Sequence, residues 1–164
     1  MCVIEKNTGG VVMTENDRNK PAPGRKQIMI VDDHAVVREG LTRLICGEKG
    51  LDVCGGAQNA VEAIKILATA PVDLVIMDIS IEGMNGIQLT EKIKSLYPDL
   101  PVIMLTIHDD PAYARRAFRA GAAGYIAKDE ASENVIKAIR LVLSGRSYVS
   151  SRIVQRIIAA KALR

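Results

Sequence analysis

Short apolar runs alternate with longer amphipathic stretches along most of the chain, beginning at residue 27. The apolar runs are strand-sized and rich in β-forming residues, and they lie at 27–31, 51–54, 72–77, 102–105 and 124–127. Runs with apolar residues on both sides suit strands buried on both faces of a parallel sheet. The stretches between them repeat apolar residues at helical spacing. The pattern therefore predicts an α/β fold, in which a doubly wound five-stranded parallel sheet has helices on both faces.

Residues that favour helix ends fall where this pattern requires them. Asn59 is placed to cap one helix, Pro111 to open another in its first turn, and Ser132 to start the last. Gly121 and Gly145 stand where two helices should stop, because glycine readily adopts the left-handed conformation that ends a helix. The expected helix boundaries therefore agree with the apolar periodicity.

Two segments flank the predicted globular domain, which we place at residues 27–145. Residues 1–26 lack periodicity and end in a stretch with prolines and glycine, so we expect a disordered leader. Met13 within this leader is a second candidate start. Residues 146–164 are expected to form a basic amphipathic helix or a linker. Because one helix does not make a helix-turn-helix, this stretch is no complete DNA-binding module.

Length and composition narrow the classes of function. The chain has 164 residues, a single-domain length, and only 3% are aromatic. So few aromatics argue against a base-stacking surface or an aromatic cofactor pocket. Residues 27–133 carry ten basic and sixteen acidic residues, whereas residues 134–164 carry seven basic and no acidic residue. We interpret the basic end as a solvated face rather than as a nucleic-acid site.

The sequence shows no signal for a membrane or for secretion. Its longest apolar runs are strand-sized, which is too short to cross a bilayer. The first four residues are followed at once by Glu5 and Lys6, so no hydrophobic stretch suits a secretory signal. We therefore expect a cytoplasmic protein without a membrane partner.

Chemically reactive side chains follow four of the five predicted strands. Asp32 and Asp33 come directly after the first strand, Asp78 after the third and Lys128 after the fifth, while Thr106 stands at the end of the fourth. Since the carboxyl ends of parallel strands meet at one edge of a sheet, we expect these five residues to lie close together. Taken singly, an aspartate after a strand is more often a turn former or a helix cap. Their joint occurrence favours a functional site.

The chemistry of these five residues indicates phosphoryl transfer. Three crowded carboxylates raise one another's pKa unless a cation compensates. Mg²⁺ suits a site with few protein carboxylates, because waters and a phosphoryl oxygen complete its ligands. Lys128 adds a second, fixed positive charge. An acid cluster, a metal, a hydroxyl and a lysine are the parts of a phosphoryl-transfer site in which a carboxylate is the nucleophile.

Five motifs resemble those of the receiver domain of two-component response regulators. They lie at 30–34, 74–78, 83–86, 105–110 and 120–129. The resemblance extends over residues 27–144, and the last two motifs, with the residues that follow them, are similar to the LuxR-type (NarL/FixJ) subfamily. Members of that subfamily carry a DNA-binding domain. The resemblance implies a flavodoxin-like fold with the strand order 2-1-3-4-5.

The resemblance also implies a phosphoacceptor and a metal site. Asp78 would accept a phosphoryl group from the phosphohistidine of a sensor histidine kinase. Asp33 and Asp78 would hold Mg²⁺. Asp32 would act on the metal through a water molecule, and the main-chain carbonyl of Ser80 would complete the protein ligands.

A conformational switch is implied in the same way. Thr106 and Lys128 would bind phosphoryl oxygens, and Tyr125 would turn inward when Thr106 moves toward the phosphoryl group. Ser80 and His108, each two residues past a key residue, would tune how fast water removes that group. Without the resemblance, Tyr125 is equally consistent with a half-exposed aromatic on a strand.

One position departs from the family pattern. Glu82 stands four residues after Asp78, where receiver domains usually have proline. Proline would stiffen this loop, whereas glutamate adds an acidic group near an acidic site, so metal affinity and loop rigidity are the properties affected. His34 and His108 flank the site without the spacing of metal ligands, and we expect satisfied or solvated histidines.

We expect a signalling switch rather than a turnover enzyme. In the favoured interpretation, the chain is the phosphoacceptor of a transcription regulator that contacts DNA only through a domain outside residues 1–164. The alternative is a standalone receiver that acts as a relay intermediate or by protein contact. A haloacid-dehalogenase-like phosphatase would need a second aspartate where Ser80 stands, and the chain has no Walker motif of an NTPase.

The output surface is expected on the fourth helix, the fifth strand and the fifth helix. The fifth helix, which we place at 134–144, is apolar almost all round, so the residues that do not pack on the sheet need another partner. We expect a phosphorylation-dependent homodimer through this surface. The basic helix at 150–163 either covers the surface or links to an output domain.

Overall fold

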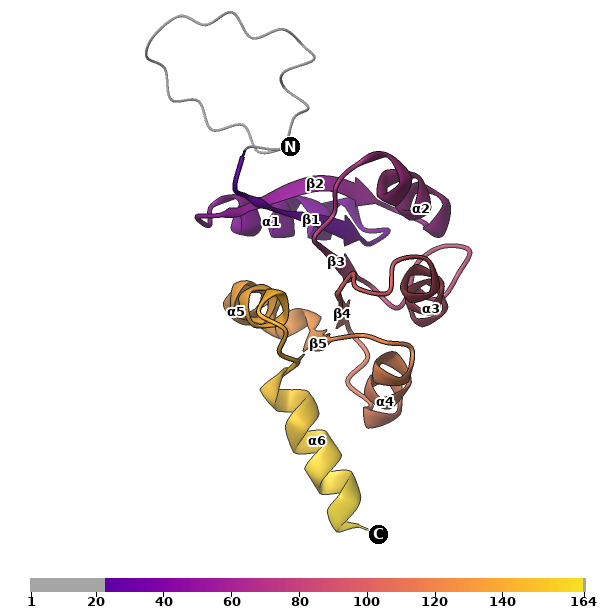
Figure 1. Cartoon of the computed structure of the whole chain (residues 1–164). Coiled ribbons are helices and arrows are strands. Elements are labelled where there is room, and N and C mark those ends of the chain that lie inside the picture. Colours follow the sequence, from indigo (N-terminus) through magenta and orange to yellow (C-terminus); the bar gives the residue numbers. More distant parts are fainter. Residues whose placement is uncertain (1–22, 164) are drawn as a thin grey trace, which may run out of the picture.

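The computed structural model describes residues 23–163 of the chain. The predicted leader, Met13 included, therefore lies almost entirely outside the described residues. Strands and helices alternate as the apolar pattern predicts (Figure 1). The strands are β1 (Lys26–Val31), β2 (Leu51–Ala57), β3 (Leu74–Met77), β4 (Val102–Thr106), β5 (Gly124–Ala127) and β6 (Tyr148–Val149). The helices are α1 (Ala35–Cys46), α2 (Ala60–Thr69), α3 (Gly86–Leu96), α4 (Pro111–Arg119), α5 (Ala131–Leu143) and α6 (Ser151–Ala162), with a 3₁₀ turn at Lys128–Glu130.

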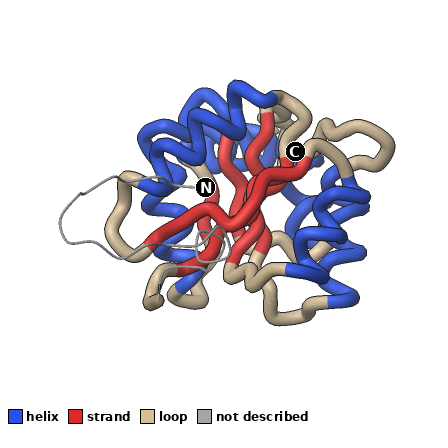
Figure 2. The backbone as a smooth tube through the Cα atoms, turned by 90° about the horizontal axis from the view of Figure 1, so that it is seen from above, coloured by secondary structure: helices blue, strands red, loops and turns tan. Residues whose placement is uncertain are grey.

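All strands pair in parallel in one six-stranded sheet with the order β2-β1-β3-β4-β5-β6. The predicted doubly wound fold and the order 2-1-3-4-5 are confirmed. The sixth strand was not predicted, because Tyr148 and Val149 alone are too short to show a pattern. Helices α2, α3 and α4 cover one face of the sheet, and α1 and α5 cover the other (Figures 1 and 2).

Both faces of the sheet are apolar, as expected for strands that are covered on two sides. In β1, Met29 and Val31 pack with the residues of α2, α3 and α4, whereas Ile28 and Ile30 pack with those of α1 and α5. None of these four side chains is more than 1% exposed. The two-sided packing fixes the ends of the strands, and it thereby brings the residues that follow them to one edge.

Two strands differ in length from the predicted runs. β3 begins at Leu74 and not at residue 72, because the Asp73 carboxylate accepts a hydrogen bond from the Gln27 N–H (2.7 Å) in place of a main-chain carbonyl. β2 continues beyond residue 54 to Ala57, because the glycines that follow residue 54 stay paired with β1 past an irregularity in register.

The predicted helix ends are close to those observed. The Asn59 side chain accepts a hydrogen bond from a main-chain N–H in the first turn of α2, and Pro111 opens α4. Gly121 and Gly145 follow α4 and α5 with φ angles of +100° and +88°, in the left-handed region that favours glycine. α5 begins one residue before Ser132, because the 3₁₀ turn after β5 runs directly into it.

The last helix, α6, follows the edge strand β6 and runs away from the sheet toward the C-terminus (Figure 1). It belongs to the segment 146–164, and it follows β6, which pairs with β5. Neither α6 nor any other helix within residues 23–163 combines the length and the apolar character needed to cross a membrane.

Candidate functional site

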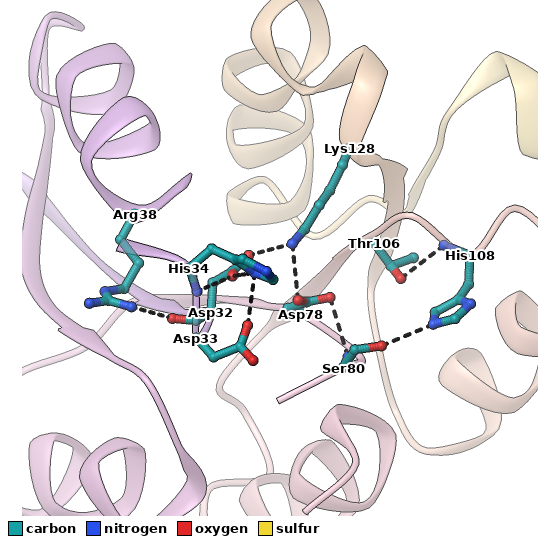
Figure 3. A network of polar contacts seen from close by, with 9 residues as sticks. All are labelled: Asp32, Asp33, His34, Arg38, Asp78, Ser80, Thr106, His108 and Lys128. Carbon is teal, nitrogen blue, oxygen red and sulfur yellow. Dashed lines mark hydrogen bonds and ion pairs between the residues drawn. The ribbon is translucent and has the colours of Figure 1, made fainter. Parts of the chain in front are cut away.

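The structure brings the five strand-end residues to one edge of the sheet (Figure 3). Asp32 and Asp33 follow β1, Asp78 follows β3, Thr106 is the last residue of β4, and Lys128 follows β5. These strands lie side by side in the order β1-β3-β4-β5, so their carboxyl ends form one continuous edge. The edge is therefore the candidate site.

Lys128 bridges the two buried acids. Its Nζ lies 2.7 Å from Asp32 Oδ2 and 3.0 Å from Asp78 Oδ2. The carboxylates are only 2% and 3% exposed, and the lysine side chain is 16% exposed. Two buried carboxylates that contact the same lysine repel each other, and the lysine ammonium group supplies the cation that offsets this repulsion.

Burial is the largest single influence on the pKa values of Asp78 and Lys128. It raises the pKa of Asp78, and the charge of Asp32 adds to the rise, although hydrogen bonding and charge from Lys128 oppose it. Burial acts to lower the pKa of Lys128, but its close contacts with the Asp32 and Asp78 carboxylates outweigh that effect and raise the pKa. Lys128 therefore stays protonated, while Asp78 is a more basic carboxylate than one in water.

His34 closes over both acids of the β1–α1 turn. Its N–H donates to Asp32 Oδ1 (2.9 Å), and its ring Nδ1 lies 3.0 Å from the same oxygen. The same Nδ1 lies 2.8 Å from Asp33 Oδ1. The side chain is 65% exposed and its ring is bonded, in agreement with the expectation of a satisfied or solvated histidine. His34 also joins the acid cluster directly.

Arg38, a residue that sequence reasoning missed, holds the main chain of the same turn. Its Nη1 donates to the Asp32 carbonyl (2.6 Å). The Asp32 N–H in turn donates to the Ala57 carbonyl of β2 (3.0 Å). A Cβ at Gly56 would lie 3.3 Å from the Arg38 side chain, so the glycine there leaves room for the arginine. Both polar groups of the Asp32 main chain are thus bonded, and the position of its carboxylate is fixed.

The main chain of Asp78 is held as firmly as that of Asp32. Its N–H donates to the Val31 carbonyl (2.8 Å), which ties the end of β3 to β1. The first residue of α3, Gly86, approaches so closely that a Cβ there would lie 1.9 Å from the Asp78 carbonyl oxygen. The Gly86 N–H donates to the Ile79 carbonyl (2.7 Å). Glycine is therefore a steric requirement for the loop that carries the acid.

A chain of polar contacts links Asp78 to the β4–α4 loop (Figure 3). The Ser80 N–H donates to Asp78 Oδ1 (3.3 Å), and Ser80 Oγ lies 3.0 Å from His108 Nε2. The His108 N–H donates to the Oγ1 of the buried Thr106 (3.1 Å). The His108 ring stacks on Tyr113 at 4.5 Å between ring centroids. His108 is thus a junction of the site, and its ring is bonded as expected of a satisfied histidine. Its tuning of phosphoryl removal stays a prediction.

Tyr125 points inward and is fully buried. Its hydroxyl donates to the His108 carbonyl (2.6 Å), and burial raises the pKa of this hydroxyl. The inward orientation decides against the half-exposed aromatic considered from the sequence. The Tyr125 hydroxyl bonds the His108 carbonyl and Thr106 bonds the His108 N–H, so the two residues named for the switch are connected through the main chain of one residue.

The acid cluster has a donor set that fits Mg²⁺. Asp32, Asp33, His34 and Asp78 each offer one ligand atom, and these atoms lie within 4.8 Å of one another. Carboxylate oxygens are the hard ligands that Mg²⁺ prefers, and the exposed Asp33 leaves the site open to solvent. Glu82 is exposed, and its main chain forms an isolated β-bridge with Asn59.

Known proteins resemble this chain in sequence and in fold. Residues 28–140 match the family model described as the response regulator receiver domain. The chain is 40% identical over 130 residues to the response regulator UvrY of Escherichia coli (strain K12). The aligned residues make up 79% of this chain and 60% of UvrY. The chain is 34% identical over 131 residues to the response regulator GacA of Pseudomonas aeruginosa, with 80% and 61% covered.

Solved structures agree. A two-component response regulator of the LuxR family from Aurantimonas sp. SI85-9A1 superposes with a TM-score of 0.80 at 36% identity, over 84% of this chain and 99% of that chain. The RcsB response regulator of Salmonella typhimurium shares the fold with a TM-score of 0.76 at 24% identity, over 81% of this chain and 67% of that chain.

The chain spans about 60% of the length of the curated relatives it matches. The match to the family model nevertheless covers most of the chain, including β2 to β5 in full and β1 from residue 28 onward. The chain therefore belongs to the family of response regulator receiver domains, and it is of the LuxR type.

Proposed function

We propose that this chain is a phosphoacceptor, and that Asp78 takes a phosphoryl group from the phosphohistidine of a sensor histidine kinase. One observation carries the proposal: the Asp78 carboxylate is buried at the sheet edge against a lysine that also contacts a second buried acid. An acid with this surrounding can receive a phosphoryl group, because cations neutralise the incoming charge.

The proposed step is a displacement at phosphorus. An oxygen of Asp78 attacks, the P–N bond of the phosphohistidine breaks, and a P–O bond forms. The leaving imidazole keeps the electron pair and is protonated by solvent. Lys128 holds Asp78 Oδ2 at 3.0 Å, whereas within residues 23–163 Oδ1 has the longer contact from the Ser80 N–H (3.3 Å). We therefore expect Oδ1 to be the attacking atom.

Divalent metal is part of this proposal. Asp33 and Asp78 would hold Mg²⁺, with Asp32 acting through water and the Ser80 main-chain carbonyl as a further ligand. The metal would supply the charge neutralisation that one lysine cannot give to three acids and a phosphoryl group. The raised pKa of Asp78 supports a role for a bound cation, because a cation favours the ionised carboxylate.

After transfer, Thr106 and Lys128 would bind phosphoryl oxygens. Thr106 Oγ1 accepts a hydrogen bond from the His108 N–H, and the His108 carbonyl accepts one from the Tyr125 hydroxyl. Movement of Thr106 toward the phosphoryl group would thus be transmitted to Tyr125 through His108. Phosphorylation would thus be a local charge change that shifts the β4–α4 loop between two arrangements.

Control of transcription through a DNA-binding domain outside residues 1–164 is the output we propose. The LuxR-type relatives, which are longer than this chain, support it. A phosphorylation-dependent homodimer through α4, β5 and α5 would be the signal passed on. The alternative output is a relay or a protein contact made by the receiver alone. In either case the chain is a switch in the cytoplasm and not a turnover enzyme.

The proposal is tested by treating the protein with a small phosphodonor and Mg²⁺ and measuring its intact mass. We expect the wild type to gain one phosphoryl group and Asp78→Asn to gain none. Asp99→Asn is the matched control, because Asp99 is exposed and lies ahead of β4, at the opposite edge of the sheet. Full labelling of Asp78→Asn would contradict the proposal.

A further inference from the structure

The start of α6 is built into the sheet. β6 pairs with β5, and the buried Ser150 that follows donates its N–H to the Tyr125 carbonyl (3.0 Å). The Ser150 hydroxyl accepts a bond from the Ala127 N–H (3.4 Å). One turn later, Ile153 is fully buried in the core on the α4 side of the sheet. The first turn of α6 is therefore anchored to the strand that carries the switch tyrosine.

The rest of α6 is attached loosely. Ile157 is half-buried against the same core cluster, which also includes Tyr113 and Phe118 of α4. Val154 and Ile158 are 40% and 62% exposed. A helix of this length is marginal in water without packing partners, so α6 depends on its contact with α4. Elements with so few buried contacts open at low cost.

Two ion pairs tie α6 to the loops of the phosphoryl site. Arg156 Nη2 lies 2.7 Å from Asp109 Oδ2, and Arg152 pairs with Asp129. Asp109 belongs to the β4–α4 loop that begins after Thr106, and Asp129 is the residue after Lys128. Both proposed phosphoryl-binding residues are thus close in sequence to a carboxylate that holds α6.

Charge makes these two acids necessary for docking. The described part of α6 carries Arg152, Arg156 and Lys161 and no acid, and α4 presents exposed arginines and no acid. The two helices repel each other electrostatically. The apolar contacts of Ile153 and Ile157 and the two ion pairs hold them together.

We propose that α6 is the resting occupant of the α4–β5 surface, and that phosphorylation of Asp78 releases it. This inference rests on the proposed function. A Thr106 that moves toward the phosphoryl group draws the β4–α4 loop with it and separates Asp109 from Arg156. The surface that α6 leaves becomes available to a second copy of this chain. By reciprocity, α6 docking opposes phosphorylation to the same degree.

Hydrogen–deuterium exchange of α6 tests this in the full chain. We expect the amides of residues 154–162 to exchange about fivefold faster or more after treatment with phosphodonor and Mg²⁺. Intact mass is measured on the same samples. Asp78→Asn should show no change in exchange, because it is not phosphorylated.

Charge substitutions identify the ion pair as the link. Arg156→Glu should raise α6 exchange about threefold without phosphodonor, and the double variant Arg156→Glu with Asp109→Arg should restore the wild-type rate. Lys161→Glu is the matched control, because it makes the same charge change on the same helix, where no ion pair of Lys161 is seen within residues 23–163. Equal effects of Arg156→Glu and Lys161→Glu would overturn the assignment of the ion pair.

The two levels of the proposal fail differently. A full gain of mass with unchanged or slower α6 exchange would overturn the inference and leave the proposed function standing. No gain of mass would overturn the proposed function, and the inference with it.

Discussion

The two sides of the candidate site are held in different ways. On the β1–β3 side, main-chain hydrogen bonds fix Asp32 and Asp78 to neighbouring strands. On the β4–β5 side, side-chain contacts of His108 hold the loop after β4, and Ile107 in that loop is 73% exposed. The acids, on what we call the rigid side, are therefore part of the sheet scaffold, whereas the proposed switch residues Thr106 and Tyr125, on what we call the mobile side, bond a loop that side-chain contacts hold. A receiver needs both properties, because its chemistry requires fixed geometry and its output requires movement.

The largest effect is expected at Gly86, on the rigid side. A Cβ there would lie 1.9 Å from the Asp78 carbonyl, and this carbonyl belongs to the main chain, which cannot rotate away. We expect Gly86→Ala to lower the free energy of unfolding by about 4 kcal/mol, measured by urea denaturation. Gly40→Ala in α1 is the control, because its Cβ meets nothing within 4 Å and should stabilise the helix by about 0.5–1 kcal/mol. Equal effects would show that the close approach is not rigid.

The next effect is expected at Lys128, which joins the two sides. Lys128→Ala leaves Asp32 and Asp78 buried without their cation, and we expect a loss of about 3 kcal/mol in the absence of divalent metal. Added Mg²⁺ should recover a large part of the loss, because it supplies positive charge to the same acids. Lys65→Ala, at an exposed position in α2, is the control. A loss that Mg²⁺ does not reduce would contradict the shared role.

A smaller effect, dependent on pH, is expected at Asp78. Its pKa is raised in the folded protein, chiefly by burial, so the folded state binds more protons than the unfolded state between the two pKa values. Stability without metal should therefore decline as the pH rises from about 4, the usual pKa of aspartate, through the folded pKa of Asp78. Asp78→Asn should lack this decline and should be more stable than the wild type above that range. Parallel stability curves for the two proteins would show that burial of the charge is not unfavourable.

The smallest effect is expected at Tyr125, on the mobile side. Tyr125→Phe removes the hydrogen bond to the His108 carbonyl and keeps the packing of the ring. We expect a loss of about 1 kcal/mol in stability and an unchanged gain of mass with phosphodonor. Tyr97→Phe at the end of α3, where the side chain is half-buried, is the control. Loss of phosphorylation in Tyr125→Phe would show that the two sides are not separable.

The sequence predicted most of the rigid side. A run of apolar residues ends at a visible point, and the residue after it is carried to the sheet edge by the topology alone. Asp32, Asp33, Asp78 and Lys128 were placed in this way, and the structure puts them together. The contacts of Arg38 were not predicted, because they depend on a side chain that reaches back from the helix to the main chain of the turn.

Less of the mobile side was predicted, for a physical reason. β6 is two residues long and owes its pairing to the free edge of β5. The ion pair between Arg156 and Asp109 joins residues from distant parts of the chain, so no local sequence pattern predicts it. His108 gains its role from contacts with Ser80 and Tyr113, which tertiary packing alone brings together. Such interactions follow from the fold and not from periodicity.

Locating the phosphoryl group on the chain tests the central claim most directly. An aspartyl phosphate can be reduced by borohydride to homoserine, and mass spectrometry of peptides then identifies the position. After treatment with phosphodonor and Mg²⁺, we expect homoserine at residue 78 alone, and none when the metal is removed by a chelator. Homoserine at residue 32 or 33, or equal labelling of residue 78 without metal, would contradict the account.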